Sequence, residues 1–219
     1  PDYADPHDAD NTYTWYDGNP ASNGGTAGTE GAGTDTEDFI TALNSAQFGG
    51  YTDWRLPSAQ ELSYLADRGA AQAPCIDTAY FPETLDQYWT ATTDPSNSQK
   101  SAAISFSNGG YMNFPDKSEK NLVRAVRGQQ AAQSFIDNGD GTVIDNNTGL
   151  MWQKDSTSNI SWQDALAHCE GLTLAGYDDW RLPNTNELIS LVDYSRTSPS
   201  IDTEYFINTA WHYWSSTTC

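Results

Sequence analysis

The sequence predicts an α+β protein built from two tandem copies of one domain, each with two helices and a small, mostly antiparallel sheet. Three observations lead to this prediction: a long internal repeat, helix-start signals that occur in both copies, and short apolar segments joined by turn residues. The 219 residues suffice for one large domain or two small ones, each able to bury a core.

The internal repeat consists of two collinear blocks. From Gly49 to Asp67, 11 of 19 positions are identical to those found 126 residues later, including the run Gly-Tyr-x-Asp-Trp-Arg-Leu-Pro. A second block, Pro74–Thr93, matches Pro199–Thr218 at an offset of 125 with 11 of 20 identities. We therefore expect a first repeat at 1–128, a linker at 129–134 and a second repeat at 135–219.

The two copies differ in what they lack. Copy one continues past Thr93 to Arg127, whereas copy two opens with Phe135–Lys154, for which copy one has no counterpart ahead of Tyr13. This complementarity predicts that the second repeat is truncated at its C-terminus and that the chain is a window from a longer protein. A further difference is a Gly/Thr/Ala-rich insertion at 19–36 in copy one, which predicts a long loop.

Both copies carry the same helix signals. Ser58 with Glu61, and Asn184 with Glu187, have capping-box spacing directly after Leu-Pro. An earlier helix is predicted in each copy from apolar residues at helical spacing: Phe39, Leu43 and Ala46 in copy one, and Trp162, Leu166 and Cys169 in copy two.

Strands are predicted from short apolar segments between turns. The turn residues are Ser107–Gly110 in copy one and Asp137–Gly141 in copy two. The strands are expected at 88–93, 102–107, 111–114 and 122–126 in copy one, and at 135–136, 142–144 and 150–152 in copy two.

Charge and composition exclude several function classes. The chain has 30 Asp+Glu against 10 Lys+Arg, a net charge of −20, which disfavours nucleic acid and anionic membrane as partners. No apolar run approaches the roughly 20 residues of a membrane-spanning helix, so we expect no membrane insertion. The 27 aromatic residues (8 Trp, 12 Tyr and 7 Phe) are typical of a folded chain.

The repeated motifs are predicted to be structural rather than functional. A tryptophan could stack on a sugar and the following arginine could hold an anion, but their place at a loop-to-helix junction favours a buried Trp and an Arg paired with a Glu or a backbone carbonyl. The residues concerned are Trp54, Arg55 and Glu61, with Trp180, Arg181 and Glu187 in copy two. Tyr88-Trp89 and Tyr213-Trp214 are likewise predicted to be core strand residues.

One loop offers a candidate metal site. Asp137 and Asp140, with Asp145 following, have spacing that could hold Ca²⁺, although the bidentate Glu of an EF-hand loop is replaced by Thr148. A plain Asp/Asn/Gly hairpin turn explains the same residues. Calcium is thus the only cofactor that the sequence suggests.

The chain resembles a bacterial family, the C-terminal domain of Legionella collagen-like adhesin. The resemblance rests on Gly-Tyr-x-Asp-Trp-Arg-Leu-Pro, Ile-Asp-Thr-x-Tyr-Phe and Tyr-Trp-Ser-Ser-Thr-Thr, together with Asp140–Trp152 and Val123–Gly128. It implies a C-type-lectin-like fold related to formylglycine-generating enzymes, in secreted or surface-exposed proteins used for attachment. The adhesin's domain is associated with sulfated glycosaminoglycans, but the charge of −20 favours a neutral glycan or a protein here.

Three functions follow as expectations. The first is a non-catalytic extracellular binding or adhesion module, and the second is a structural subunit of an extracellular assembly that packs against copies of itself. The third, an enzyme of the formylglycine-generating type, is weaker because its chemistry uses cysteines, and the cysteines here do not recur between copies. In an extracellular protein their odd number predicts disulfides, with these candidates: Cys75, Cys169 and Cys219.

Overall fold

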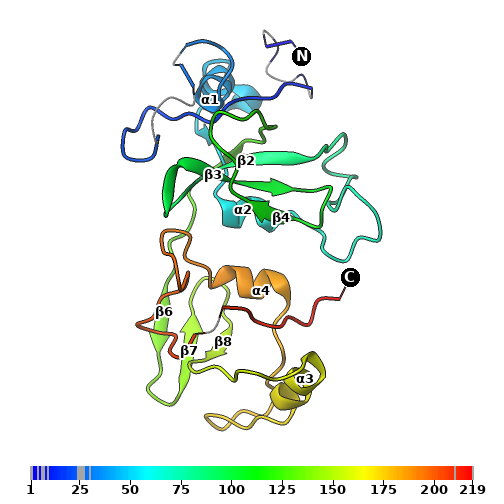
Figure 1. Ribbon diagram of the computed structural model, residues 1–219, viewed down its shortest axis with the longest axis vertical. Coiled ribbons are helices and arrows are strands. Elements are labelled where there is room, and N and C mark those ends of the chain that lie inside the picture. Colours follow the sequence, from blue (N-terminus) through cyan, green and yellow to red (C-terminus); the bar gives the residue numbers. More distant parts are fainter. Residues whose placement is uncertain are drawn as a thin grey trace. The chain divides into compact units, whose positions relative to one another are not determined.

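The structure is a computed structural model that describes residues 2, 3, 5, 8, 10–23, 28, 29, 31–209 and 211–218. It divides into two compact units, Pro1–Gln130 and Ala131–Thr218, so their boundary falls within the segment expected to be a linker. Both units combine short helices with small antiparallel sheets, which makes the chain α+β (Figure 1). No described helix has the length and apolarity needed to cross a bilayer.

Unit 1 contains a three-stranded antiparallel sheet of order β2-β3-β4 and a separate pair, β1-β5. Its elements are α1 (Thr36–Ser45), the short 3₁₀ helix η1 (Phe48–Gly50), β1 (Trp54–Arg55), α2 (Ala59–Ser63), β2 (Gln87–Asp94), β3 (Asn97–Ser105), β4 (Tyr111–Asn113) and β5 (Val126–Arg127). In β2–β3 pairing, Tyr88 lies opposite Ile104 and Trp89 opposite Ala103. The predicted turn at 107–110 joins β3 to β4, with Gly109 and Gly110 at positive φ.

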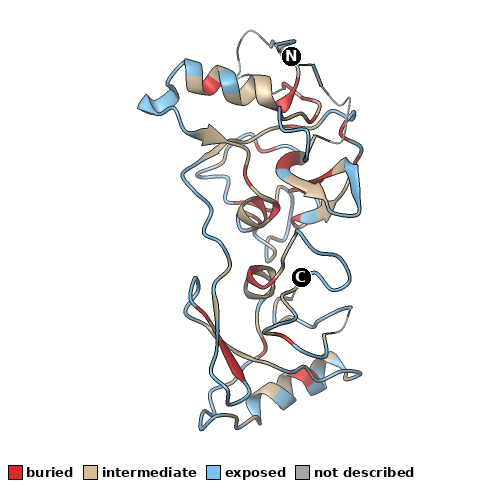
Figure 2. Cartoon of the chain, turned by 90° about the vertical axis from the view of Figure 1, so that its left-hand side faces the viewer, coloured by how far each residue is buried: buried red, intermediate tan, exposed pale blue. Residues whose placement is uncertain are grey.

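The helices of unit 1 begin where capping side chains satisfy their first backbone N–H groups. Asp35 is fully buried, and its carboxylate accepts the N–H groups of Glu37 and Asp38 at the start of α1. Along α1, Thr36 and Leu43 are buried, Thr41 and Ser45 are exposed, and the other residues are half-buried (Figure 2). The helix therefore packs one face on the unit and leaves the other in solvent.

The strand expected at 122–126 is largely wrong. Leu122 makes one bridge to Tyr88 at the edge of β2, and only Val126–Arg127 form a strand, which pairs with β1. Between them the Arg124 guanidinium lies 4.7 Å from the centre of the Phe81 ring and donates to Thr84 Oγ1 at 2.8 Å. These contacts hold the intervening chain against the core rather than in a sheet.

Two clusters form the core of unit 1. The larger one unites α2 with the sheet and contains these buried residues: Leu62, Ala66, Ile76, Tyr88, Ile104, Phe106 and Leu122. The second contains Trp15, Trp89 and Ala103. Each of its tryptophans bonds the chain segment of the other: Trp15 Nε1 donates to the Thr90 carbonyl at 2.8 Å, and Trp89 Nε1 donates to the Tyr13 carbonyl at 2.7 Å.

Unit 2 has one antiparallel sheet, of order β6-β7-β8, and two helices. Its elements are β6 (Phe135–Asp137), β7 (Thr142–Asp145), β8 (Met151–Gln153), α3 (Trp162–Glu170) and α4 (Thr185–Ser190). Its core contains Val143, Leu191 and Phe206, with Trp152 packed against them. The central strand β7 carries most of the buried residues of this sheet (Figure 2).

The prediction that Tyr213 and Trp214 are core strand residues is wrong. They are 45% and 52% exposed, and residues 211–218 form no strand. The counterpart strand β2 in unit 1 pairs with β3 at both of its ends, with an irregularity between Trp89 and Thr93, whereas the described residues of unit 2 contain no strand that pairs with 213–218. Without a paired strand at this position, the two rings stay about half-exposed.

A buried lysine lies beside the tryptophan pair of unit 1. Lys117 is 1% exposed, its Nζ lies 3.7 Å from the centre of the Trp15 ring, and it donates to Thr93 Oγ1 at 2.9 Å and to the Ser22 carbonyl. Burial lowers the pKa of Lys117 from 10.5 to about 8, and Asp17 only partly opposes this effect. The folded state therefore releases a proton at a pH where the unfolded chain still holds it.

This lysine predicts an unusual alkaline stability profile. Because the unfolded state binds more protons than the folded state above pH 8, unit 1 should gain roughly 1–2 kcal/mol between about pH 8 and 9.5 relative to Lys117→Met. Urea unfolding of both proteins across this range measures the difference. Lys100→Met, which removes a half-exposed lysine on β3, is the control, and equal slopes for all three proteins would contradict the assignment.

Candidate functional site

A pocket of about 540 Å³ opens on unit 1 and is the candidate binding site. Its walls come from the segment ahead of the Gly-rich insertion, the start of α1, the Arg-Leu-Pro block, β2 and the end of the unit. The lining residues are Trp15, Tyr16, Asp17, Thr36, Glu37, Ile40, Arg55, Leu56, Ser58, Ala91, Gln129 and Gln130. Apolar and aromatic groups are thus combined with two carboxylates and two amides, as in pockets for small polar ligands.

The acidic wall of the pocket is fixed by backbone contacts. Tyr16 N–H donates to Thr36 Oγ1 at 2.9 Å, and the same hydroxyl donates to the Tyr16 carbonyl at 2.7 Å. Thr36 N–H also donates to the Thr14 carbonyl at 2.9 Å. These bonds place Tyr16 and Asp17 beside Glu37 at the start of α1.

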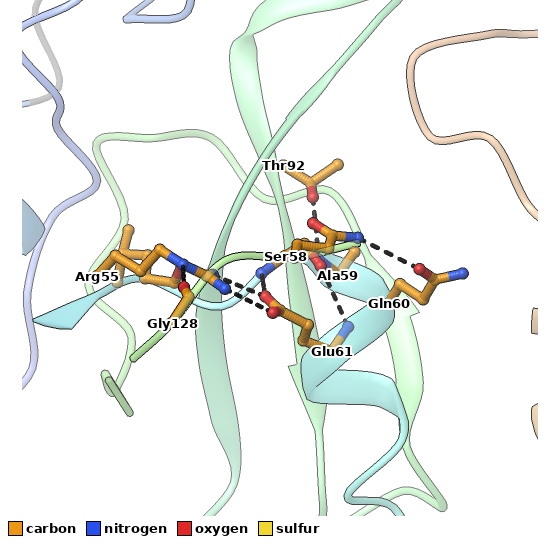
Figure 3. A network of polar contacts seen from close by, with 9 residues as sticks. Arg55, Ser58, Ala59, Gln60, Glu61, Thr92 and Gly128 are labelled. Carbon is orange, nitrogen blue, oxygen red and sulfur yellow. Dashed lines mark hydrogen bonds and ion pairs between the residues drawn. The ribbon is translucent and has the colours of Figure 1, made fainter. Parts of the chain in front are cut away.

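The opposite wall rests on a network centred on Arg55 (Figure 3). Its Nη1 and Nη2 donate to Glu61 Oε2 and Oε1 at 2.8 and 2.7 Å, and its Nε donates to the Gly128 carbonyl at 2.7 Å. Glu61 also accepts the Ser58 N–H at 2.8 Å, while Ser58 Oγ accepts the Glu61 N–H at 3.2 Å. One carboxylate therefore completes the helix cap and holds the arginine that joins α2 to the end of unit 1.

Copy two repeats this network at its centre. Arg181 donates two parallel bonds of 2.7 and 2.6 Å to Glu187, which forms a capping box with Asn184. The side chain of Arg181 is 57% exposed, compared with 32% for Arg55. The same ion pair is thus more screened by water in unit 2.

The pKa values of both glutamates are lowered. Burial acts to raise the pKa of Glu61, but hydrogen bonds from Arg55 and Ser58 outweigh it. For Glu187 the hydrogen bonds from Arg181 are the largest effect. Each carboxylate is therefore held in its charged form, as an ion pair in a structural role requires.

The repeated tryptophans close loops rather than fill the core. Trp54 is half-buried, and its indole N–H donates to the Phe48 carbonyl at 3.0 Å. Asn44 on α1 holds its backbone through two bonds, of 2.8 and 2.9 Å. Trp180, also half-buried, donates to the Leu174 carbonyl at 3.4 Å. Neither ring belongs to a described core cluster. The expectation that these tryptophans are core residues is therefore wrong.

The three aspartates proposed for calcium have separate local partners. Asp137 pairs with Lys154, Asp140 accepts the Thr142 N–H at 3.1 Å, and Asp145 accepts the Thr148 hydroxyl at 2.8 Å. Within the described residues, no three Asp, Glu, His or Cys side chains form a group that could hold a metal ion. The three aspartates have the geometry of a hairpin turn. This geometry does not support calcium binding, which stays a prediction.

The described cysteines form no disulfide in this structure. Cys75 is buried in unit 1 and Cys169 is half-buried on α3 of unit 2, and both are free thiols. The two lie in different units, and neither unit holds a second described cysteine that could pair with them. Burial raises the pKa of the Cys169 thiol, which makes it a poor thiolate. Cys219 lies outside the described residues.

The sequence did not identify the pocket. Tyr16, Asp17 and Glu37 do not recur in copy two and match no motif. Only their position in the sequence could have pointed to the pocket. They border the two ends of the insertion at 19–36, which is where copy one differs from copy two.

The comparisons with known proteins identify the repeats. The family model of the Lcl C-terminal domain matches residues 4–127 and 141–219, in two tandem segments. Neither the curated proteins nor the solved structures gave a match.

The two arginine–glutamate pairs predict unequal mutational effects. Glu61→Gln keeps an acceptor for the helix cap but removes the charge, and should cost about 2 kcal/mol, since Arg55 also bonds the end of the unit. Glu187→Gln should cost about 0.5 kcal/mol because its partner is more exposed. Hydrogen exchange of α2 and α4 reports each effect in its own unit.

The controls are Ser58→Ala and Asn184→Ala, which remove the caps and should cost about 1 kcal/mol each. Since both glutamate pKa values lie below 4.5 in the folded state, each pair's contribution should be present above pH 4.5 and lost as the pH falls through the lowered pKa. Equal losses for the two Gln variants would contradict the difference in burial.

Proposed function

The chain belongs to the Lcl C-terminal domain family, and we propose that it is a non-catalytic adhesion module that binds an uncharged glycan through the pocket of unit 1. The family is adhesin-like, which suggests a binding role at a surface or outside the cell. The observation that carries the proposal is the combination of Tyr16, Asp17 and Glu37 with Gln129 and Gln130 around one pocket.

The chemistry of the pocket suits sugar hydroxyls. Carboxylate and amide side chains can accept or donate hydrogen bonds to vicinal hydroxyl groups, and an aromatic side chain can cover the apolar face of a sugar ring. Tyr16, Asp17 and Glu37 are only half-buried, so a ligand can reach them. The volume of about 540 Å³ lies within the range of small-ligand sites, which is roughly 300–1,000 Å³.

Charge argues against a polyanionic ligand. The three arginines that are prominent in the unit 1 motifs are already engaged: Arg55 with Glu61, Arg127 with Asp53 at 3.0 Å, and Arg124 over two aromatic rings. With a net charge of −20, the chain repels sulfated chains at long range. An uncharged glycan avoids this repulsion.

We also infer that both units have the C-type-lectin-like fold and no catalytic activity. The fold inference is supported by family membership and by the two helices and small antiparallel sheets of each unit. A formylglycine-generating enzyme acts through cysteines, and the free thiols Cys75 and Cys169 occupy non-equivalent positions in the two units.

The proposal predicts salt-resistant binding of neutral glycans. On an array, the intact chain should bind uncharged oligosaccharides equally well at low and high salt, since hydroxyl recognition involves little counterion release. Tyr16→Ala and Glu37→Gln should each weaken binding about tenfold, which corresponds to about 1.4 kcal/mol. Binding restricted to sulfated glycans and abolished by salt would contradict the proposal.

The matched control is Tyr177→Ala, which removes a 49% exposed aromatic side chain from unit 2 and should leave glycan binding unchanged. Electron microscopy of the same preparation tests the assembly hypothesis. Filaments or rings in the absence of any glycan hit would favour a structural subunit over an adhesion module.

A further inference from the structure

The turn that joins β3 to β4 contains an Asn-Gly pair, Asn108-Gly109. Gly109 and Gly110 both have positive φ, of 62° and 74°, and Tyr111 N–H donates to the Asn108 carbonyl at 2.9 Å. Residues 108–111 therefore form the kind of tight turn that hairpins favour. The sequence has two other Asn-Gly pairs, at 23–24 and 138–139, and the first of them includes a residue outside those described.

The Asn108 side chain and the Gly109 N–H are both unrestrained. Within the described residues, neither of them takes part in a hydrogen bond. Asn108 is exposed, and a Cβ built on Gly109 would meet no described group within 4 Å. The side chain of Asn108 is therefore free to rotate toward the nitrogen of Gly109.

The turn is anchored on both sides of this pair. Ser107 Oγ donates to Asp86, and Gly110 N–H donates to the Ser105 carbonyl at 2.9 Å. Gly110 also lies tightly against the core, because a Cβ at this position would be 2.4 Å from the Cβ of Ala66. The freedom of the turn is thus confined to the Asn-Gly pair itself.

The other fully described pair, Asn138-Gly139 in unit 2, is held in place. Asn138 Nδ2 donates to Thr142 Oγ1 at 2.9 Å, and Gly139 N–H donates to Asp137 Oδ1 at 3.0 Å. Asp137 pairs in turn with Lys154. The carboxylate favours the protonated form of the Gly139 nitrogen, and the threonine hydroxyl restrains the amide side chain. The same two residues therefore stand in two different environments.

We propose that Asn108 is a site of spontaneous covalent modification, at which its side-chain amide is converted into a carboxylate. The Gly109 nitrogen loses its proton and attacks Cγ of Asn108. A new C–N bond forms, the Cγ–Nδ2 bond breaks, and the leaving nitrogen takes up a proton and departs as ammonia. Water then opens the cyclic succinimide at either of its two carbonyl carbons, which gives aspartate or isoaspartate. The net reaction consumes one water and releases one ammonia, without an oxidant or a cofactor.

The geometry of the turn favours the first step. Tyr111 N–H is bonded to the Asn108 carbonyl, which belongs to the same peptide group as the Gly109 N–H. This bond stabilises the negative charge that the peptide group acquires when the nitrogen loses its proton. Glycine leaves the nitrogen uncrowded and tolerates the positive φ. No residue of the pocket takes part, so the inference is independent of the glycan proposal.

The two products should affect unit 1 differently. Aspartate keeps the backbone of the turn and adds one negative charge at an exposed position. Isoaspartate carries the main chain through the former side chain, which lengthens the backbone of the turn by one atom. Because Gly110 has no room to shift toward Ala66, the extra length should weaken the pairing of β4 with β3.

The experiment incubates the intact chain at mildly alkaline pH and follows the conversion of each asparagine by peptide mapping with mass spectrometry. We expect Asn108 to be converted at least about tenfold faster than Asn138, because the two hydrogen bonds of the second pair must open first. In guanidinium chloride that unfolds the chain, the two rates should approach each other, which separates the effect of the fold from that of the flanking residues. Equal rates in the folded chain, or faster conversion of Asn138, would overturn the proposal.

Variants test the cause of the difference. Asn108→Gln has a longer side chain that disfavours ring closure, so it should abolish the reaction at this position. Asp137→Ala frees the Gly139 N–H and should speed the conversion of Asn138 several-fold. Lys154→Met, which leaves that N–H bonded to Asp137, is the matched control and should not. An unchanged rate at Asn138 in Asp137→Ala would contradict the role assigned to the hydrogen bond.

The effect on β4 is measured by amide hydrogen exchange on the isoaspartyl form after its separation by chromatography. Exchange in β4 should be several-fold faster in this form than in Asn108→Asp, which carries the same charge on a normal backbone. Exchange in the β6–β7 hairpin of unit 2 should be the same in both. Equal exchange of β4 in the two proteins would contradict the expected loss of strand pairing.

Discussion

The structure of unit 1 depends on two hydrogen bonds through which two tryptophans tie their own chain segments together. Trp15 donates its indole N–H to the Thr90 carbonyl and Trp89 donates its own to the Tyr13 carbonyl, so the segment ahead of α1 and strand β2 are tied together in the core. The pocket wall at Tyr16 and Asp17 continues from this segment, and Lys117 lies over one of the two rings. Since both donors are buried, any displacement of β2 leaves two polar groups unsatisfied and exposes the ring of Trp89.

Unit 2 contains the same two tryptophans, Trp152 and Trp214, without the two corresponding hydrogen bonds. The Arg181–Glu187 pair and the capping box form as they do in unit 1, because they need only residues close in sequence. The tryptophan contacts of unit 1 also need β2 to be paired with a neighbouring strand. Within the described residues, only unit 1 has such a strand, which is β3. Local contacts therefore form in both copies, while the long-range contact forms only where β3 holds β2.

The same distinction explains what the sequence could predict. The helices that begin at Thr36, Ala59, Trp162 and Thr185 follow from caps and spacing within a few residues, and the hairpin turns follow from Gly and Asn. The prediction failed where contacts between residues distant in sequence determine the local structure. At Leu122 a single bridge to β2 replaces the expected strand, and at Trp214 no described strand pairs with the segment. The pocket was missed for the same reason, since Tyr16, Glu37 and Gln129 meet only in the folded chain.

Because the repeated residues are engaged internally, recognition must rest on residues that differ between the copies. Arg55 uses its guanidinium on Glu61, Leu56 and Gly128, which leaves it little capacity to bind a ligand directly. At the positions that line the pocket, by contrast, Tyr16 and Glu37 correspond to Gln153 and Gln163, the residues that follow Trp152 and the first residue of α3. Two units with one scaffold therefore present different polar groups at these equivalent positions. Because the scaffold residues are the same in both copies, we infer that ligand specificity depends on the residues that border the insertion.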